Sequence, residues 1–238
     1  MRALALSLLA ASIVVAVLAA EEAPSAQNSG LNLTAKTANV AGAPDDVRIE
    51  IVRWSTDDER ERLMTAWNLK PGAASGGRGA GKAGKGAGKA GGAGRAGKGG
   101  FKGGAPAVEA PSTPEAELAK ALQQTTTVGY LWSSETAGYA LRYAGKLSNG
   151  DGSQRVVLMT HRRLGATNQL WNPTVSGAPN SYEFSVIELR LNAKGEGEGK
   201  ASLLGKVLPD DAAKIVTLEN YDSLPSVFSD VRIKAGRQ

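Results

Sequence analysis

Apolar and polar residues alternate with a period of two over much of the chain. In LNLTAK at 31–36 and VRIEI at 47–51, every second residue is apolar, so each segment has one apolar and one polar face. Further strand candidates are found at 128–133, 138–144, 155–160, 200–207, 213–220 and 227–233. Short strands with turn signals between them are typical of antiparallel sheets. We therefore expect an α+β fold with a predominantly antiparallel, curved, barrel- or sandwich-like sheet.

The segment SYEFSVIELRLN at 181–192 carries two apolar sets. Phe184 and Val186 share one face, whereas Ile187 and Leu189 share the opposite face. One extra residue inserted as a β-bulge would return both sets to the same core. The pattern therefore predicts a bulge at Val186 and Ile187.

Two segments predict short helices. TDDE at 56–59 is a capping box followed by an apolar stripe at helical spacing, formed by Leu63, Ala66 and Trp67. TPE at 113–115 supplies an N-cap, a proline at the first helical position and an early acid. Between two strand candidates, NGDG at 149–152 predicts a hairpin turn, because Asn and Gly accept positive φ angles.

A glycine-rich tract separates the two predicted helices. Residues 72–104 hold 16 of the 30 glycines, five lysines, two arginines and no acidic residue. Such a composition cannot bury enough apolar surface to offset chain entropy, so we predict a disordered linker over 72–106. Subtracting its seven charges from the net +5 leaves −2 for the remaining residues. One α+β domain is then expected from 31–71 and 107–238.

The tract contains the dinucleotide fingerprint G-x-G-x-x-G three times, at 79–84, 86–91 and 92–97. The fingerprint binds pyrophosphate only where a strand precedes it and a helix follows. No strand pattern precedes the tract closely, and its glycines disfavour a following helix. A spacer is therefore the favoured interpretation. A polycation for anionic partners is the alternative.

The first twenty residues predict export. MRALALSLLAASIVVAVLAA places Arg2 before an apolar run that ends in small residues, as in a secretory signal. We expect residues 1–20 to be removed, residues 21–30 to be flexible, and the protein to be periplasmic or secreted. An uncleaved membrane anchor is the alternative. With no cysteine in the chain, no disulfide can form.

The candidate binding residues are basic. Arg155, His161, Arg162 and Arg163 form a candidate anion-contacting surface at the end of a predicted strand. We predict no catalytic residue, since no nucleophile elbow or comparable motif accompanies the only histidine. The alternative is a hydrolase acting outside the cytoplasm, with His161 as base near Ser133–Glu135.

Cofactors and metals are not expected. One histidine and no cysteine leave carboxylates as the main metal ligands, which disfavours zinc. In KGEGEGK at 194–200, Glu196 and Glu198 lie on one side of an extended backbone, as a carboxylate pair for acid–base chemistry would. The neighbouring glycines favour a solvated hairpin instead.

The partner expectations follow from the charge distribution. The basic tract predicts weak contact with anionic envelope polymers, and its lone aromatic residue, Phe101, disfavours specific nucleic-acid binding. After signal cleavage no transmembrane span is expected. The function best supported is a non-enzymatic binding or envelope-associated protein.

Several segments resemble a group of uncharacterised exported bacterial proteins. The resemblance rests on IEIVRWSTDDERERL, VGYLWSSETAGYALRYA, YEFSVIELRLNAKGEGEGK and TLENYDSLPSVFSDVRI, and covers most of 47–71 and 115–238. It implies export and no established activity. In the similar proteins an acidic residue is usual where this chain has His161, which argues against a histidine mechanism.

Overall fold

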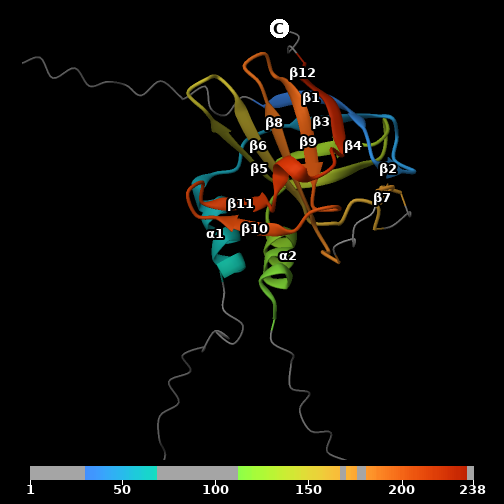
Figure 1. Cartoon of the computed structure of the whole chain (residues 1–238). Coiled ribbons are helices and arrows are strands. Elements are labelled where there is room, and N and C mark those ends of the chain that lie inside the picture. Colours follow the sequence, from blue (N-terminus) through green and yellow to red (C-terminus); the bar gives the residue numbers. More distant parts are fainter. Residues whose placement is uncertain (1–29, 69–111, 167–169, 176–180, 235–238) are drawn as a thin grey trace, which may run out of the picture.

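The computed structural model of the chain describes residues 30–68, 112–166, 170–175 and 181–234. Figure 1 shows a β-barrel with two helices and a small hairpin packed on its outside. The elements along the chain are β1 (Leu31–Thr37), β2 (Val40–Ala41), β3 (Asp46–Ile51), α1 (Asp57–Asn68), α2 (Pro114–Gln124), β4 (Gly129–Trp132), β5 (Gly138–Ser148), β6 (Gln154–Thr160), β7 (Asn172–Pro173), β8 (Ser185–Leu191), β9 (Glu196–Ala201), β10 (Val207–Asp210), β11 (Ile215–Leu218), the 3₁₀ turn η2 (Tyr221–Ser223) and β12 (Phe228–Ile233).

Eight strands close into an antiparallel barrel in the order β1, β12, β9, β8, β6, β5, β4, β3. β3 pairs with β1 from Leu31 opposite Ile51 to Lys36 opposite Asp46, which completes the ring. Every strand of the barrel therefore has two hydrogen-bonded neighbours, and β5 extends past β4, which pairs with residues 138–141 of it. The predicted α+β class with a largely antiparallel sheet is confirmed, and the curved sheet is a closed barrel.

Side chains fill the barrel interior. An eight-stranded barrel is just wide enough for its inward-facing side chains to meet. The large buried residues here include Trp171 and Phe228, whose ring centroids are 5.7 Å apart. The aliphatic core around them includes Leu33, Ile49, Leu131, Leu141, Leu158, Ile187 and Leu189. The apolar faces of the alternating segments therefore point into the barrel, as their period of two predicts.

A second apolar cluster lies outside the barrel, between β5, β6, β8 and the elements that cover them. It joins Tyr143, Met159 and Val186 of the strands to Leu63 of α1 and Leu118 of α2. The β10–β11 hairpin contributes Ile215, Val216 and Leu218 to the same cluster. The outer faces of β5, β6 and β8 are thus covered.

The bulge predicted at Val186 and Ile187 is wrong. β8 pairs with β6 in unbroken register from Gln154 opposite Leu191 to Thr160 opposite Ser185. Phe184 and Val186 belong to the outer cluster, whereas Ile187, Leu189 and Leu191 belong to the interior. The start of β8 is covered on both faces, so Val186 and Ile187 are apolar on opposite sides and no extra residue is needed, whereas Glu188 and Arg190 continue the outer face as charged residues.

The helix caps form as predicted. The Thr56 backbone N–H donates to the Glu59 carboxylate at 3.0 Å, and the Glu59 N–H donates to the Thr56 hydroxyl at 3.2 Å. At the second helix, Thr113 Oγ1 accepts from the Ala116 N–H at 3.3 Å. α1 and α2 lie side by side, with the end of α1 near the start of α2 (Figure 1).

Two turn predictions have different outcomes. The hairpin at 149–152 is confirmed, since Asn149 N–H donates to Ser153 O at 2.9 Å and Gly152 has a φ of 82°. The single strand predicted at 200–207 is wrong. β9 ends at Ala201, and a turn over 202–204 leads into β10 at Val207, which pairs with β11 instead of continuing in the barrel.

Several predictions lie outside the described residues. These are the signal at 1–20, the segment at 21–29 and the glycine-rich tract with its three fingerprints. Among the residues that the structure describes, no helix is long and apolar enough to cross a bilayer.

Candidate functional site

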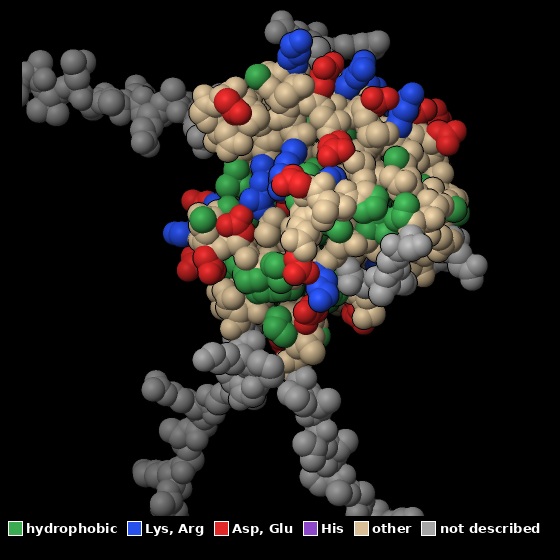
Figure 2. All heavy atoms as spheres, in the orientation of Figure 1, with side chains coloured by type: hydrophobic (Ala, Val, Ile, Leu, Met, Phe, Trp, Pro, Cys, Tyr) green, Lys and Arg blue, Asp and Glu red, His purple; other side chains and the backbone are tan. Residues whose placement is uncertain are grey.

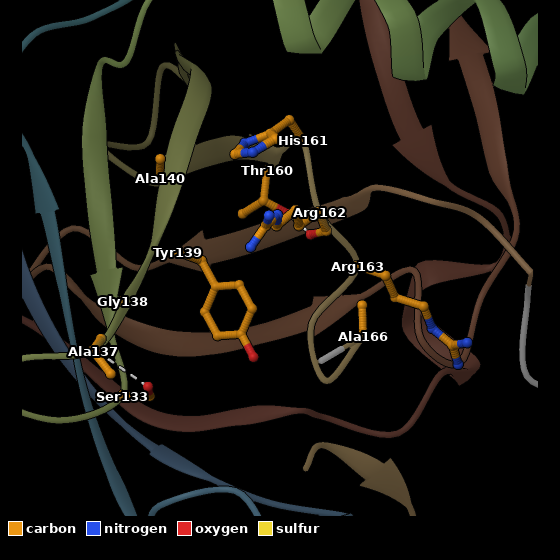
Figure 3. Close-up of a pocket in the computed structure, with 10 residues that line it drawn as sticks. All are labelled: Ser133, Ala137, Gly138, Tyr139, Ala140, Thr160, His161, Arg162, Arg163 and Ala166. Atoms are coloured by element: carbon orange, nitrogen blue, oxygen red, sulfur yellow. Dashed lines mark hydrogen bonds between the residues drawn. The ribbon is translucent and has the colours of Figure 1, made fainter. Parts of the chain in front are cut away.

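A cavity of about 250 Å³ lies where the β4–β5 turn meets the loop after β6. The lining residues are Ser133, Ala137, Gly138, Tyr139, Ala140, Thr160, His161, Arg162, Arg163 and Ala166. The lining includes two arginines and a histidine but no carboxylate, and Figure 3 shows these side chains arranged around Tyr139. We take this cavity as the candidate site and call it the basic pocket.

Hydrogen bonds to the end of β6 hold the pocket loop. The Thr160 hydroxyl donates to the carbonyl oxygen of Arg162 at 2.6 Å and accepts from the Ser185 N–H at 3.3 Å. The Ser185 hydroxyl in turn accepts from the Leu164 N–H at 3.0 Å. Thr160 and Ser185 are both fully buried, so these bonds satisfy polar groups that water cannot reach. They fix the backbone that carries the two arginines.

Gly165 allows the loop to turn under Tyr139. Its φ is +82°, and a Cβ at this position would lie 1.9 Å from the carbonyl oxygen of Leu170. The Gly165 N–H donates to the Tyr139 hydroxyl at 3.1 Å. The ring of Tyr139 packs edge-on against Trp171 in the barrel interior, with centroids 6.3 Å apart. The wall of the pocket is thereby attached to the barrel core.

His161 is held by a neighbouring arginine outside the lining. The Arg142 guanidinium donates through Nε to His161 Nδ1 at 3.3 Å and through Nη1 to the carbonyl oxygen of Thr125 at 2.7 Å. Burial lowers the pKa of His161 below its ordinary value of 6.5, and the charges of Arg142 and Arg162 lower it further. His161 is therefore favoured in its neutral form near pH 7.

The two adjacent arginines point in opposite directions. In Figure 3 the Arg162 guanidinium points toward Tyr139 and His161, whereas the Arg163 guanidinium points away beyond Ala166. Within the part of the chain that the structure describes, no ion pair neutralises Arg162, Arg163 or Arg142. The pocket therefore has an uncompensated positive charge that attracts anions.

Arg155 lies apart from the pocket. It sits near the opposite end of β6 from His161, roughly 20 Å away at about 3.3 Å per strand residue. Its Nε lies 3.2 Å from the Glu188 carboxylate, and its Nη1 lies 2.7 Å from the Asp210 carboxylate. The structure thus brings together His161, Arg162 and Arg163 of the predicted surface, and places Arg155 between β8 and β10.

Basic and acidic side chains alternate on the face that carries the β10–β11 hairpin, as Figure 2 shows. Arg190 reaches both Glu188 at 3.2 Å and Asp222 at 2.8 Å. Lys200 is 4% exposed and lies 3.3 Å from Glu198. Charge on this face is therefore largely compensated, unlike charge in the basic pocket.

The serines proposed for the hydrolase alternative serve the β4–β5 turn. Ser133 donates through its hydroxyl to the carbonyl oxygen of Ala137 at 3.2 Å. The Ser134 hydroxyl accepts from the N–H groups of Thr136 and Ala137 at 3.3 and 2.9 Å. Neither serine hydroxyl is hydrogen-bonded to His161 in the described structure. The arrangement is that of an ordered turn and not of a nucleophile with its base.

The two carboxylates of β9 have separate partners. Glu196 lies 4.0 Å from Arg232, whereas Glu198 accepts from the Ser226 hydroxyl and pairs with Lys200. The Ser226 hydrogen bond is the main cause of a lowered pKa at Glu198. In the described ranges, no cluster of acidic residues and histidine has the geometry of a metal site.

Sequence reasoning missed Arg142 and Tyr139 as parts of the site. A register shift in the β5–β6 ladder between Leu141 and Tyr143 accompanies the position of Arg142 next to His161. The alternation of apolar and polar residues in GYALRYA at 138–144 does not reveal this register shift. Comparisons with protein-family models, curated proteins and solved structures found no match to this chain.

Proposed function

We propose that the protein is a non-enzymatic binding protein, exported to the periplasm or the cell exterior, that holds a small anion in the basic pocket. Export is supported by the signal-like residues 1–20. The observation that carries the binding proposal is the inward-pointing Arg162, which has no carboxylate partner in the described structure and lies beside neutral His161.

The chemistry of the pocket suits a carboxylate or phosphate group. A guanidinium donates several hydrogen bonds in one plane and binds such oxyanions in a forked geometry. Because His161 Nδ1 accepts from Arg142, the neutral imidazole carries its proton on Nε2, which can donate to the same anion. An anion bound beside the imidazole favours its charged form, so binding should raise the pKa of His161.

The test compares two neighbouring arginines. Inorganic phosphate and, separately, acetate are titrated into wild-type protein, Arg162→Gln and Arg163→Gln, with isothermal calorimetry as the readout. Loss of one charge-assisted hydrogen bond is expected to weaken binding about tenfold or more in Arg162→Gln. Because its guanidinium points away, Arg163→Gln should lose less than about threefold. Equal losses in the two variants, or no binding by wild type, would contradict the proposal.

The single histidine provides a second readout. The chain has one His, so its imidazole C–H signals in a proton NMR spectrum can be followed without assignment. Phosphate should raise the titration midpoint of His161 in wild type and in Arg163→Gln. In Arg162→Gln, the addition of phosphate should leave the titration midpoint of His161 nearly unchanged.

A further inference from the structure

A groove separate from the basic pocket runs between the start of α1, strand β5 and the β10–β11 turn. It consists of two adjoining hollows of about 570 and 510 Å³, and Asp57 and Arg60 line both. The first hollow includes Trp54, Tyr143 and Lys146. We call the two hollows together the α1 groove.

Trp54 supplies an aromatic surface at one end of the α1 groove. The residue lies between β3 and α1 and is half-buried, with its ring packed on the end of the barrel core. Lys146 Nζ lies 5.4 Å from the centroid of the indole ring. The Lys146 ammonium lies over the indole, and because this lysine is exposed a ligand can displace it to reach the flat apolar face of the ring.

Tyr143 places an unpartnered hydroxyl in the same hollow. The residue is 3% exposed, it lines the groove, and its hydroxyl has no hydrogen-bond partner among the described residues. Burial raises the pKa of Tyr143 far above its usual range, so the phenol stays protonated and can both donate and accept. A Cβ on Gly145 would lie 2.3 Å from the Tyr143 hydroxyl, so this glycine leaves room for it. The hydroxyl is not sealed from solvent, so a hydroxyl of a ligand in the hollow can replace the water that bonds to it in the free protein.

The charges that line the α1 groove are balanced. The acidic residues are Asp57, Glu61 and Asp211, and the basic residues are Arg60, Lys146 and Lys214. Arg60 Nη2 lies 3.0 Å from Asp57 Oδ1, so a donor and an acceptor stand side by side where the hollows join. Such a surface does not select a net charge. It suits an uncharged ligand with many hydroxyl groups, each of which needs a donor and an acceptor.

The β5 wall of the α1 groove comes from the part of the strand that extends past β4. Residues 143–148 of β5 pair with β6, whereas β4 pairs with residues 138–141. On the side away from β6, the Ser55 N–H donates to the Ala144 carbonyl oxygen at 2.9 Å and the Ala144 N–H donates to the Ser55 hydroxyl at 3.1 Å. The opposite wall comes from α1 side chains and the turn that contains Ala213.

We propose that the α1 groove binds a linear, uncharged oligosaccharide. The C–H face of one sugar ring packs on Trp54, the Tyr143 hydroxyl exchanges hydrogen bonds with that ring, and the Asp57–Arg60 pair binds hydroxyls of the next sugar. The site is independent of the basic pocket, so it does not rest on the function proposed above.

The test uses three neutral hexasaccharides as probes, namely maltohexaose, cellohexaose and chitohexaose. Each is titrated into ¹⁵N-labelled full-length protein and followed through the indole N–H signals and by calorimetry. At least one should bind and shift the Trp54 indole signal. Tyr143→Phe, which removes only the hydroxyl, should weaken that binding about 3- to 10-fold. Tyr130→Phe is the matched control, because Tyr130 is exposed on β4 outside the groove lining, and it should bind like wild type.

Folding is checked with the same variants. Tyr143→Phe removes an unpartnered polar group, so its Tm should equal or exceed that of wild type. Arg162→Gln should leave saccharide binding unchanged. The proposal is overturned if no hexasaccharide binds, if Tyr143→Phe binds as tightly as wild type, or if an uncharged decapeptide binds in the groove while the saccharides do not.

Discussion

Arg53 and Glu59 form a two-pronged ion pair that joins the end of β3 to the first turn of α1. Nη1 donates to Oε2 at 2.8 Å, and Nη2 donates to Oε1 at 2.7 Å. Nη2 also donates to Thr126 Oγ1 at 2.7 Å, in the segment between α2 and β4. The side-chain hydrogen bond from Arg53 is the main reason that the pKa of Glu59 falls to about 2. One carboxylate therefore connects the barrel to both helical segments.

Glu59→Gln is expected to destabilise the protein by about 1–3 kcal/mol, because it removes a charge-assisted hydrogen-bond pair and weakens the capping box. Glu59 has a pKa in the folded state below its usual 4.5. Its contribution to stability is therefore complete above about pH 4.5 and is lost as the pH falls toward 2. Urea unfolding at pH 7 and pH 3 measures both effects. Glu61→Gln, at an exposed position on the same helix, is the control and should change stability by less than about 0.5 kcal/mol.

Glu188 is the central acid of the network under the β10–β11 hairpin. The residue is fully buried and accepts from Thr217 Oγ1 at 2.9 Å and the Leu218 N–H at 3.3 Å, besides its ion pairs with Arg155 and Arg190. Glu188→Leu should cost about 3–5 kcal/mol, since it leaves Arg155 mostly buried without this partner.

The double variant Glu188→Leu/Arg155→Met should recover part of that loss, because no buried arginine is then left without Glu188. Arg190 keeps Asp222, and Asp210, which loses Arg155, is 23% exposed and can be solvated. Asp222→Asn, which alters an exposed carboxylate on the rim, should change stability by less than about 0.5 kcal/mol. Thermal unfolding of the four proteins provides the comparison. A double variant less stable than Glu188→Leu would show that the ion pair does not account for the cost.

Gly165→Ala should damage the basic pocket through the backbone. At a φ of +82° and with its Cβ 1.9 Å from the carbonyl oxygen of Leu170, alanine forces the loop to move. We expect a loss of about 2 kcal/mol or more and weaker phosphate binding. Gly150→Ala is the matched control, because a Cβ there meets nothing within 4 Å. If both variants bind phosphate like wild type, the loop geometry does not shape the site.

His161 should make stability decline in mild acid. Burial and two neighbouring arginines lower its pKa in the folded state below 6.5, so the unfolded chain takes up the proton more readily. Above about pH 6.5, His161 has no effect on the stability of the fold. As the pH falls from 6.5 through the pKa of the folded state, protonation of His161 favours the unfolded chain and stability decreases. His161→Gln should therefore show a smaller drop in Tm between pH 8 and pH 5 than wild type. An equal drop would mean that other groups control the acid response.

Much of the fold is encoded in local patterns. The period-two segments at 31–36, 47–51 and 227–233 are strands, and both helices begin at the capping residues Thr56 and Thr113. The closure of the barrel depends on the pairing of β1 with β12, which lie far apart in the sequence. No local pattern specifies such pairing.

The bulge predicted at Val186 and Ile187, which the structure does not contain, shows what a local apolar pattern cannot specify. A strand that is apolar on both faces has the same sequence whether it is bulged or covered on two sides. The sequence around Val186 does not show which of the two applies, because the helices and hairpin that cover β8 come from distant segments. Whether other elements pack on the outer face of β8 is decided by the tertiary structure and not by the sequence of the strand.

Part of the candidate site was accessible from sequence. His161, Arg162 and Arg163 are consecutive and share a loop, so they stay together in any fold. Arg155 lies on β6, the strand before this loop, and pairs with Glu188 and Asp210; the Asp210 carboxylate comes from a segment 55 residues away in the sequence. Tyr143 was not a candidate, because only the packed structure shows that its hydroxyl lacks a partner.

The seam between β1 and β12 has a consequence for synthesis. A nascent chain whose β12 has not yet left the ribosome cannot close its barrel, so β1 and β9 keep unpaired edges until β12 emerges. Long-range closure of this kind is slow compared with local helix formation. Under the export proposed above, this order of events would give the polypeptide time to reach a translocation channel before it folds, and its open edges in that interval could be bound by chaperones.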